Sequence, residues 1–167
     1  VVPLLGSAVL GNYSLALQVI TVFTIFTTIL FKFLLTQESS GIQNRSLIRI
    51  VIIISVIISL VGIFLSPLVI PNFFPKYVDA GVAIQIMSLS IIPVTITTIC
   101  TSRLLSEEKS KSVLIGGLLG LSVLVSGILI LGSMYGTIGI AISFVLTAIS
   151  KATYLGLIVK KYERSIN

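Results

Sequence analysis

Residues that could support acid–base or metal chemistry are few, and the carboxylates among them lie outside the apolar parts of the sequence. There is no histidine, and the one cysteine, Cys100, stands inside an apolar run. The carboxylates are confined to polar connections and the C-terminal tail: Glu38, Asp79, Glu107, Glu108 and Glu163. General acid–base catalysis and metal binding both need such groups gathered at one site. A phosphate-binding Gly-x-x-x-x-Gly-Lys loop is also absent, so the sequence predicts no enzyme, no cofactor and no bound metal.

Two polar stripes follow apolar segments at helical spacing. The first consists of Ser14, Gln18, Thr21, Thr28 and Lys32, and the second of Gly139, Ser143, Thr147, Lys151 and Tyr154. An unpaired polar group in hydrocarbon is costly, so each stripe is expected to face protein or water. Two interpretations stay open: the hydroxyls bond between packed helices, or they line a cavity that holds a substrate.

The cationic residues bear on that choice. Lys151 lies more than two helical turns inside the last basic cluster, where a cation costs roughly 2.5–3.5 kcal/mol on insertion scales. A water-filled cavity or an anionic partner would remove most of this cost. Lys32 lies within a turn of its segment's end and can also snorkel to the interface, while Arg103 stands where an interfacial anchor is the simpler interpretation. The candidate cavity residues are Lys151, Lys32, Thr147, Tyr154, Gln18 and Arg103.

The elements that must position these residues are membrane-spanning helices. Hydrophobic residues make up 56% of the sequence and charged residues 10%, too few charges to cover a water-soluble fold. A helix needs roughly 20 apolar residues to cross the bilayer core. Five segments meet this requirement, at about 12–35, 47–70, 80–105, 113–131 and 136–160, and residues 1–10 resemble the end of a preceding helix. We therefore expect an all-α, multi-pass membrane bundle, since long unalternating runs exclude a barrel.

Small residues and prolines predict how these helices turn, pack and bend. Glycines at both ends of the 132–136 segment favour a turn there. Two seams of small residues predict close helix contacts: Ser55, Ser59, Gly62 and Ser66 in the second segment, and Gly116, Gly120 and Gly127 in the fourth. Pro93 is expected to kink the third segment, because it lacks a backbone donor. The prolines of the 71–75 stretch predict a loop there for the same reason.

The basic residues predict the orientation. Nine of them fall on one side of the five predicted segments, and Lys76 alone falls on the other. Basic loops stay in the cytoplasm, so the C-terminus is expected there, in a cell (plasma) membrane. Nucleic acid is not an expected partner, because the basic residues lie between apolar runs rather than along one face.

Three stretches have a distinctive order of residues. They are Leu5-Gly6 followed by Val9–Ala16 (VLGNYSLA), the Pro67–Met87 segment, and Tyr135–Ser143 (YGTIGIAIS). In order and spacing they resemble oligosaccharide flippases of the multidrug/oligosaccharidyl-lipid/polysaccharide exporter superfamily, such as O-antigen flippases.

The resemblance implies two six-helix bundles around a cavity that opens alternately to each side. This chain would be most of the second bundle, its N-terminal bundle would be a missing partner, and its opening on Val1 also leads us to expect a piece of a longer protein. The implied substrate is a lipid-linked glycan used in polysaccharide biosynthesis, its diphosphate met by Lys151 and Lys32. A cation-coupled multidrug exporter and a non-transporting membrane scaffold remain the alternatives.

Overall fold

The structure, a computed structural model, describes residues 7–39, 45–73 and 78–166. Its elements are α2 (Ser7–Ser39), α3 (Arg45–Phe73), α4 (Val78–Ser88), α5 (Ile91–Ser106), α6 (Ser110–Gly127), the π-helical turn η2 (Ile128–Gly132) and α7 (Ser133–Ile166). Over these described ranges there are helices and short connections and no strand, which confirms the predicted all-α class.

Two described helical runs are long and apolar enough to cross a membrane, Ile48–Phe73 and Ser110–Tyr162. A third possibility is a bent pair, Ala80–Ser88 with Ile91–Ser106. Many large apolar side chains of these runs point outward, Phe64, Leu68 and Leu118 among them. Helices of this length and composition are those of a membrane protein.

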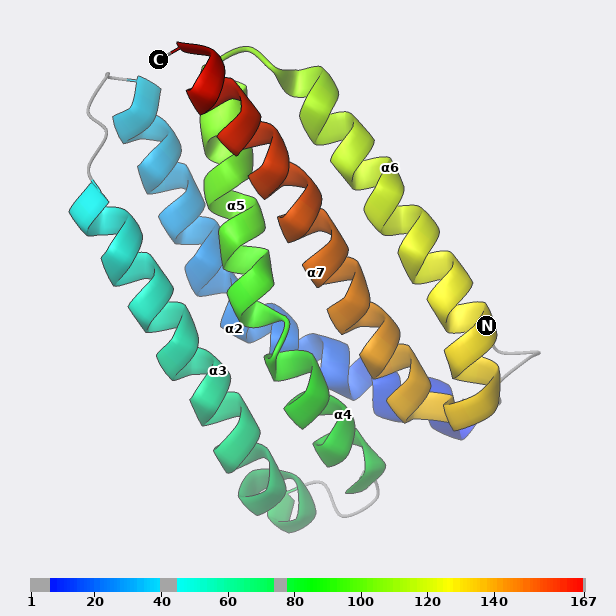
Figure 1. The fold of residues 1–167 in the computed structure, drawn as a ribbon. Coiled ribbons are helices and arrows are strands. Elements are labelled where there is room, and N and C mark those ends of the chain that lie inside the picture. The colour runs from blue at the N-terminus through cyan, green and yellow to red at the C-terminus, as the bar shows by residue number, and fades with distance from the viewer. Residues whose placement is uncertain (1–6, 40–44, 74–77, 167) are drawn as a thin grey trace.

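The Ser110–Tyr162 run is an antiparallel hairpin rather than one straight helix. Gly136 has φ 56° and ψ −127°, a backbone conformation that side chains with a Cβ rarely adopt. On either side of it the neighbours pair in reverse order, with Gly116 against Leu155 and Gly127 against Ser143. Figure 1 shows α6 and α7 next to each other, joined at this reversal. The predicted turn at 132–136 is confirmed.

The third predicted segment is broken into two helices. α4 and α5 meet at an angle of 42°, across Leu89 and Ser90, whose backbone N–H groups donate to Ile86 O (3.1 Å) and Met87 O (2.9 Å). Pro93 lies in the first turn of α5, and its ring disfavours a helical position for the carbonyl four residues earlier, at Leu89. The kink attributed to Pro93 therefore falls one turn before it, and the predicted 80–105 segment is a bent pair of helices rather than one continuous helix.

Two further boundaries differ from the prediction. α2 begins at Ser7 and continues through Leu10, so the described part of the supposed preceding helix belongs to α2; Gly11 alone is too weak a breaker, at about 1 kcal/mol. α3 continues through Pro71 to Phe73, where a loop was expected. Asn72 Nδ2 donates to Leu68 O at 2.8 Å, so a side chain satisfies a carbonyl of the last turn. The Phe74–Tyr77 part of that loop lies outside the described residues.

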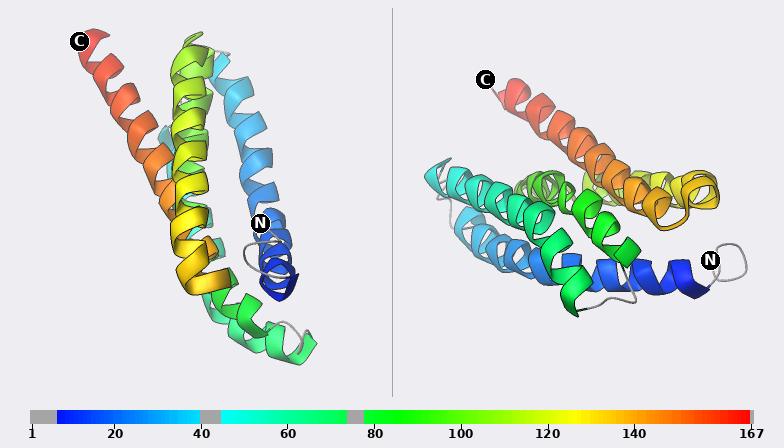
Figure 2. Two further views of the ribbon diagram at one scale, coloured as in Figure 1. Left: turned by 90° about the vertical axis from the view of Figure 1, so that its right-hand side faces the viewer. Right: turned by 90° about the horizontal axis from the view of Figure 1, so that it is seen from below.

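α4 lies at the centre of the core. Its Ala83, Ile84 and Met87 are buried against Ala16 and Ile20 of α2, with Ile70 and Ala141 completing the cluster. In the right-hand view of Figure 2, α4 lies among α3, α2 and α7.

Side-chain hydrogen bonds tie α4 to α3. Ser59 Oγ donates to Ser88 O (2.9 Å), and Ser66 Oγ donates to Gly81 O (2.8 Å). Gln85 Nε2 donates in the other direction, to Ile63 O at 3.0 Å. Such bonds and small residues hold helices together where lipid is the solvent. The predicted seam on the second segment is thus an α3–α4 contact, whereas α5 packs against α7, α2 and α3.

Candidate functional site

The second polar stripe, on α7, lies against the glycines of α6. A Cβ placed on Gly120 would be 2.7 Å from Lys151 Cγ, and one on Gly116 would be 3.2 Å from Tyr154 Cδ1. Lys151 and Tyr154 are both half-buried. The stripe therefore faces protein, one of its two expected environments, and the methylene chain of Lys151 covers Gly120.

The hydroxyls of this stripe bond within their own helix. Ser143 Oγ donates to Gly139 O, and Thr147 Oγ1 donates to Ser143 O, each at 2.8 Å. Their protons are therefore donated within α7 and not to a group of a neighbouring helix. This arrangement suits close contact between α6 and α7 more than ligand binding.

The remaining candidates are dispersed. Arg103, near the end of α5, pairs with Glu107 at 3.6 Å, as expected of an interfacial anchor. Gln18 is exposed on α2. Lys32 belongs to α2, and its side chain lies outside the described part of the structure. Among the described side chains, the structure does not gather the sequence candidates into one site.

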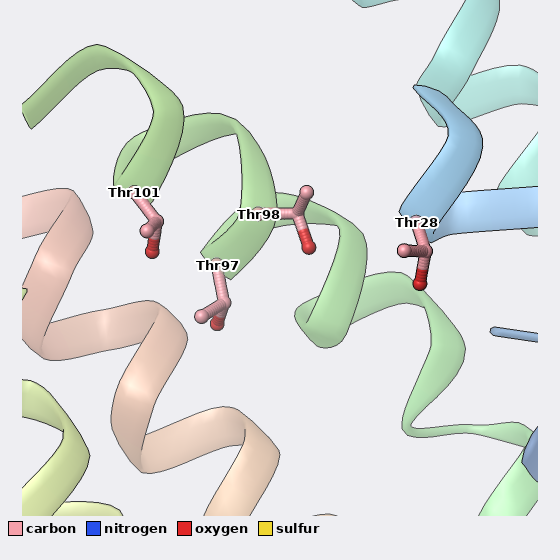
Figure 3. A pocket seen from close by; sticks show the side chains of 4 residues that line it. All are labelled: Thr28, Thr97, Thr98 and Thr101. Atoms are coloured by element: carbon pink, nitrogen blue, oxygen red, sulfur yellow. The ribbon is translucent and has the colours of Figure 1, made fainter. Parts of the chain in front are cut away.

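A different set of residues lines a hollow that we call the threonine pocket. Thr97, Thr98 and Thr101 of α5 and Thr28 of α2 surround a volume of about 200 Å³. Figure 3 shows Thr98 extending from α5 towards α2, with Thr97 and Thr101 on successive turns. Of these four residues, only Thr28 belongs to a stripe recognised in the sequence.

The hydroxyls of the threonine pocket differ in their partners. Thr28 Oγ1 donates to Thr24 O (3.0 Å), and Thr98 Oγ1 donates to Val94 O (2.9 Å). Thr97 Oγ1 is buried and has no hydrogen-bond partner among the described atoms. Buried polar groups are nearly always satisfied in native proteins, so Thr97 Oγ1 is an exception close to the pocket.

The sequence contained a signal for the pocket. Thr97, Thr98 and Thr101 follow Pro93 by one and two helical turns, so they lie on the arm that leaves the bend. No pattern within a single segment shows that α2 places Thr28 opposite these three threonines.

A second hollow of about 340 Å³ lies where the α6–α7 hairpin turns. It is lined by Val9, Val82, Tyr135, Gly136, Thr137 and Ile138. Within the described ranges, no group of three histidine, cysteine or acidic residues could hold a metal.

Searches of known protein families, curated proteins and solved structures each returned no match to this chain. The class that the fold defines is an all-α membrane protein with a broken helix and a threonine-lined pocket beside it.

Proposed function

We propose that this chain is the C-terminal helical bundle of a flippase that moves lipid-linked oligosaccharide across the plasma membrane. The observation that carries the proposal is the break between α4 and α5, bent by 42°. Transporters commonly use discontinuous helices near the bilayer midplane, where the irregular backbone borders the substrate path. A scaffold has no need for such a break.

The mechanism we propose is alternating access between this bundle and an N-terminal one. In the motion we propose, α4 stays fixed to α3 by hydrogen bonds from Ser59 and Ser66, and α5 changes its angle about Leu89 and Ser90 by sliding against α7, α2 and α3, on which it packs. The resemblance of Val9–Ala16 and Tyr135–Ser143 to polysaccharide transporters supports this assignment. Lys151 and Lys32 would meet the anionic diphosphate, and the C-terminus would lie in the cytoplasm.

The test is flipping by the full-length protein in proteoliposomes that hold a fluorescent lipid-linked oligosaccharide. We expect flipping by the wild type, a loss in Lys151→Ala, and recovery in Lys151→Arg if the charge serves the substrate. Equal flipping in all three would keep the flippase but leave Lys151 as a packing residue. A wild type that flips nothing would reject the proposal.

A non-transporting scaffold is the second candidate, and one observation favours it. The α7 stripe lies on the glycines of α6, with Lys151 over Gly120, as in a static helix pair. A cation-coupled multidrug exporter is less well supported, because such exporters usually need a buried carboxylate. Glu107 and Glu108, the acidic side chains that the structure describes, lie exposed at the α5–α6 connection. Transport of an organic cation in the same proteoliposomes would favour the exporter.

A further inference from the structure

We propose that the threonine pocket is a binding site for a neutral, hydroxyl-rich group, such as a single sugar ring. The pocket lies between α2 and α5, within this bundle, and four threonine side chains line it. The inference rests on the proposed function only for the source of the sugar.

The hydrogen-bonding pattern sets the chemistry of the ligand. The protons of Thr28 and Thr98 are already donated to carbonyls of their own helices, so these two oxygens present only lone pairs to the pocket. Thr97 Oγ1 has no partner among the described atoms, but it is buried, so it meets a ligand only after its side chain rotates. The polar part of the lining therefore consists of hydroxyl acceptors on a mostly apolar surface, and it suits a ligand that offers O–H donors.

The charges near the pocket favour a neutral ligand over a cation. Among the described residues that line the pocket there is no carboxylate. Arg103, two residues past Thr101, is rotated about 200° around α5 at 3.6 residues per turn. Without an anionic group, a bare cation would exchange its hydration for a few hydroxyls, which is unfavourable.

The size of the pocket limits the ligand. Its volume is about 200 Å³, whereas sites for drug-sized ligands run from ~300 to ~1,000 Å³. One ring of a glycan is a better match than a drug or a whole oligosaccharide. Because the pocket belongs to the arm that leaves the α4–α5 break, a bound ring would contact both α5 and α2 and would favour one angle between them.

Cysteine protection tests this site directly. In a Cys100→Ala background of the full-length protein in vesicles, we would measure the modification rate of Thr97→Cys by a charged, membrane-impermeant methanethiosulfonate. We expect modification, slowed several-fold by methyl glucoside. Adding Thr98→Val should raise the protecting concentration roughly fivefold, the equivalent of ~1 kcal/mol for one neutral hydrogen bond. Thr153→Val is the matched control, because this exposed hydroxyl of α7 bonds only to Ile149 O.

Three results would overturn the proposal. The first is a Thr97→Cys as unreactive as Thr95→Cys, a position of the same helix that is 1% exposed. The second is protection by ammonium ions equal to that by the glycoside, which would mean a cation site. The third is protection that Thr98→Val leaves unchanged.

The proposal and the proposed function fail separately. Normal flipping without protection would leave the flippase standing and remove the pocket as a sugar site. Protection without flipping would keep the pocket as a sugar site and reject the flippase. Comparing free methyl glucoside with a glycolipid carrying the same sugar in the vesicle then shows whether the site takes its ring from water or from the membrane.

Discussion

Lys151 combines an apolar contact and a charge in one side chain. Its methylenes lie over Gly120, and the side chain is half-buried rather than enclosed. Long cationic side chains cover apolar surface in this way and keep the ammonium group where it is better solvated. Because Lys151 lies deep in the fifth apolar segment, the sequence predicted that its charge faces a substrate cavity. The structure adds a packing role, the contact with Gly120, and substitutions can separate the two roles.

The contact and the charge of Lys151 predict different effects on stability. Lys151→Ala uncovers Gly120 and should lower the free energy of unfolding by ~1 kcal/mol, since about ten atom contacts at 0.1–0.2 kcal/mol each are lost. Lys151→Met keeps a chain of similar length and should cost less than half as much. Denaturant titration of the protein in detergent gives both values, with exposed Lys111→Ala as the control. Equal losses for Ala and Met would assign the effect to the charge instead.

At the scale of elements, the α6–α7 pair depends on the absence of side chains at particular glycines. A Cβ on Gly127 would lie 2.7 Å from Ser143 Oγ and 2.8 Å from Ser143 Cβ. Ser143 Cβ is bonded to the backbone and cannot rotate away, so the neighbouring helix must shift. Gly117, ten residues earlier in the same helix, has no neighbour within 4 Å of its Cβ position, so the two positions form a matched pair.

Gly127→Ala is expected to lower stability by about 1–3 kcal/mol, the usual cost of overfilling a packed contact. Gly117→Ala should be neutral or should gain up to ~1 kcal/mol from helix propensity. Thermal unfolding of both variants in the same detergent measures the difference. If the two variants unfold alike, the close contact of α6 with α7 is not what the protein relies on.

The α4–α5 break predicts a different response. Pro93→Ala restores a donor for the Leu89 carbonyl and removes the ring that disfavours a helical position for it, so the two helices should become more nearly collinear. Spin labels at Val82 and Leu105, exposed positions on α4 and α5, should then move apart. Pulsed electron–electron distance measurements test this. An unchanged distance would show that contacts with α2 and α3, rather than Pro93, hold the bend.

For the whole molecule, the sequence predicted what local chemistry decides. Composition predicted an all-α membrane protein. Gly136 predicted the hairpin, because its φ of 56° is a backbone conformation that the turn itself needs and that glycine adopts readily. The seams of small residues could also be recognised in the sequence, because two helices can approach closely only where small residues lie, whichever helix is the partner. These features depend on one segment at a time.

The threonine pocket was missed for the opposite reason. It exists because Thr28 of α2 meets a turn of α5 about 70 residues later in the chain, and no periodicity within one segment reports that pairing. The stripes were read as cavity-facing or protein-facing, and only the position of α6 decided between these for Ser143 and Lys151. Which helix covers which face is a property of the assembled bundle, so it follows from the structure rather than from the pattern.

The arrangement of the whole bundle leads to a last prediction, on which side of the membrane each end lies. Lys109 Nζ lies 3.5 Å from the centroid of the Tyr162 ring, so the α5–α6 connection and the end of α7 share one side, together with most of the basic residues. The hairpin turn between α6 and α7 lies at the other end of both helices (Figure 1), and Met134, 68% exposed, belongs to this turn.

With Cys100→Ala as background, Lys111→Cys and Lys160→Cys should therefore be labelled by an impermeant maleimide only in inside-out vesicles, because basic segments stay in the cytoplasm. Met134→Cys should be labelled only from the outside of intact cells. Labelling of Lys160→Cys and Met134→Cys from the same side would mean that the hairpin enters the membrane without crossing it. The reverse pattern, with Met134→Cys reached only from the cytoplasm, would keep both crossings and invert the bundle against its own charge asymmetry.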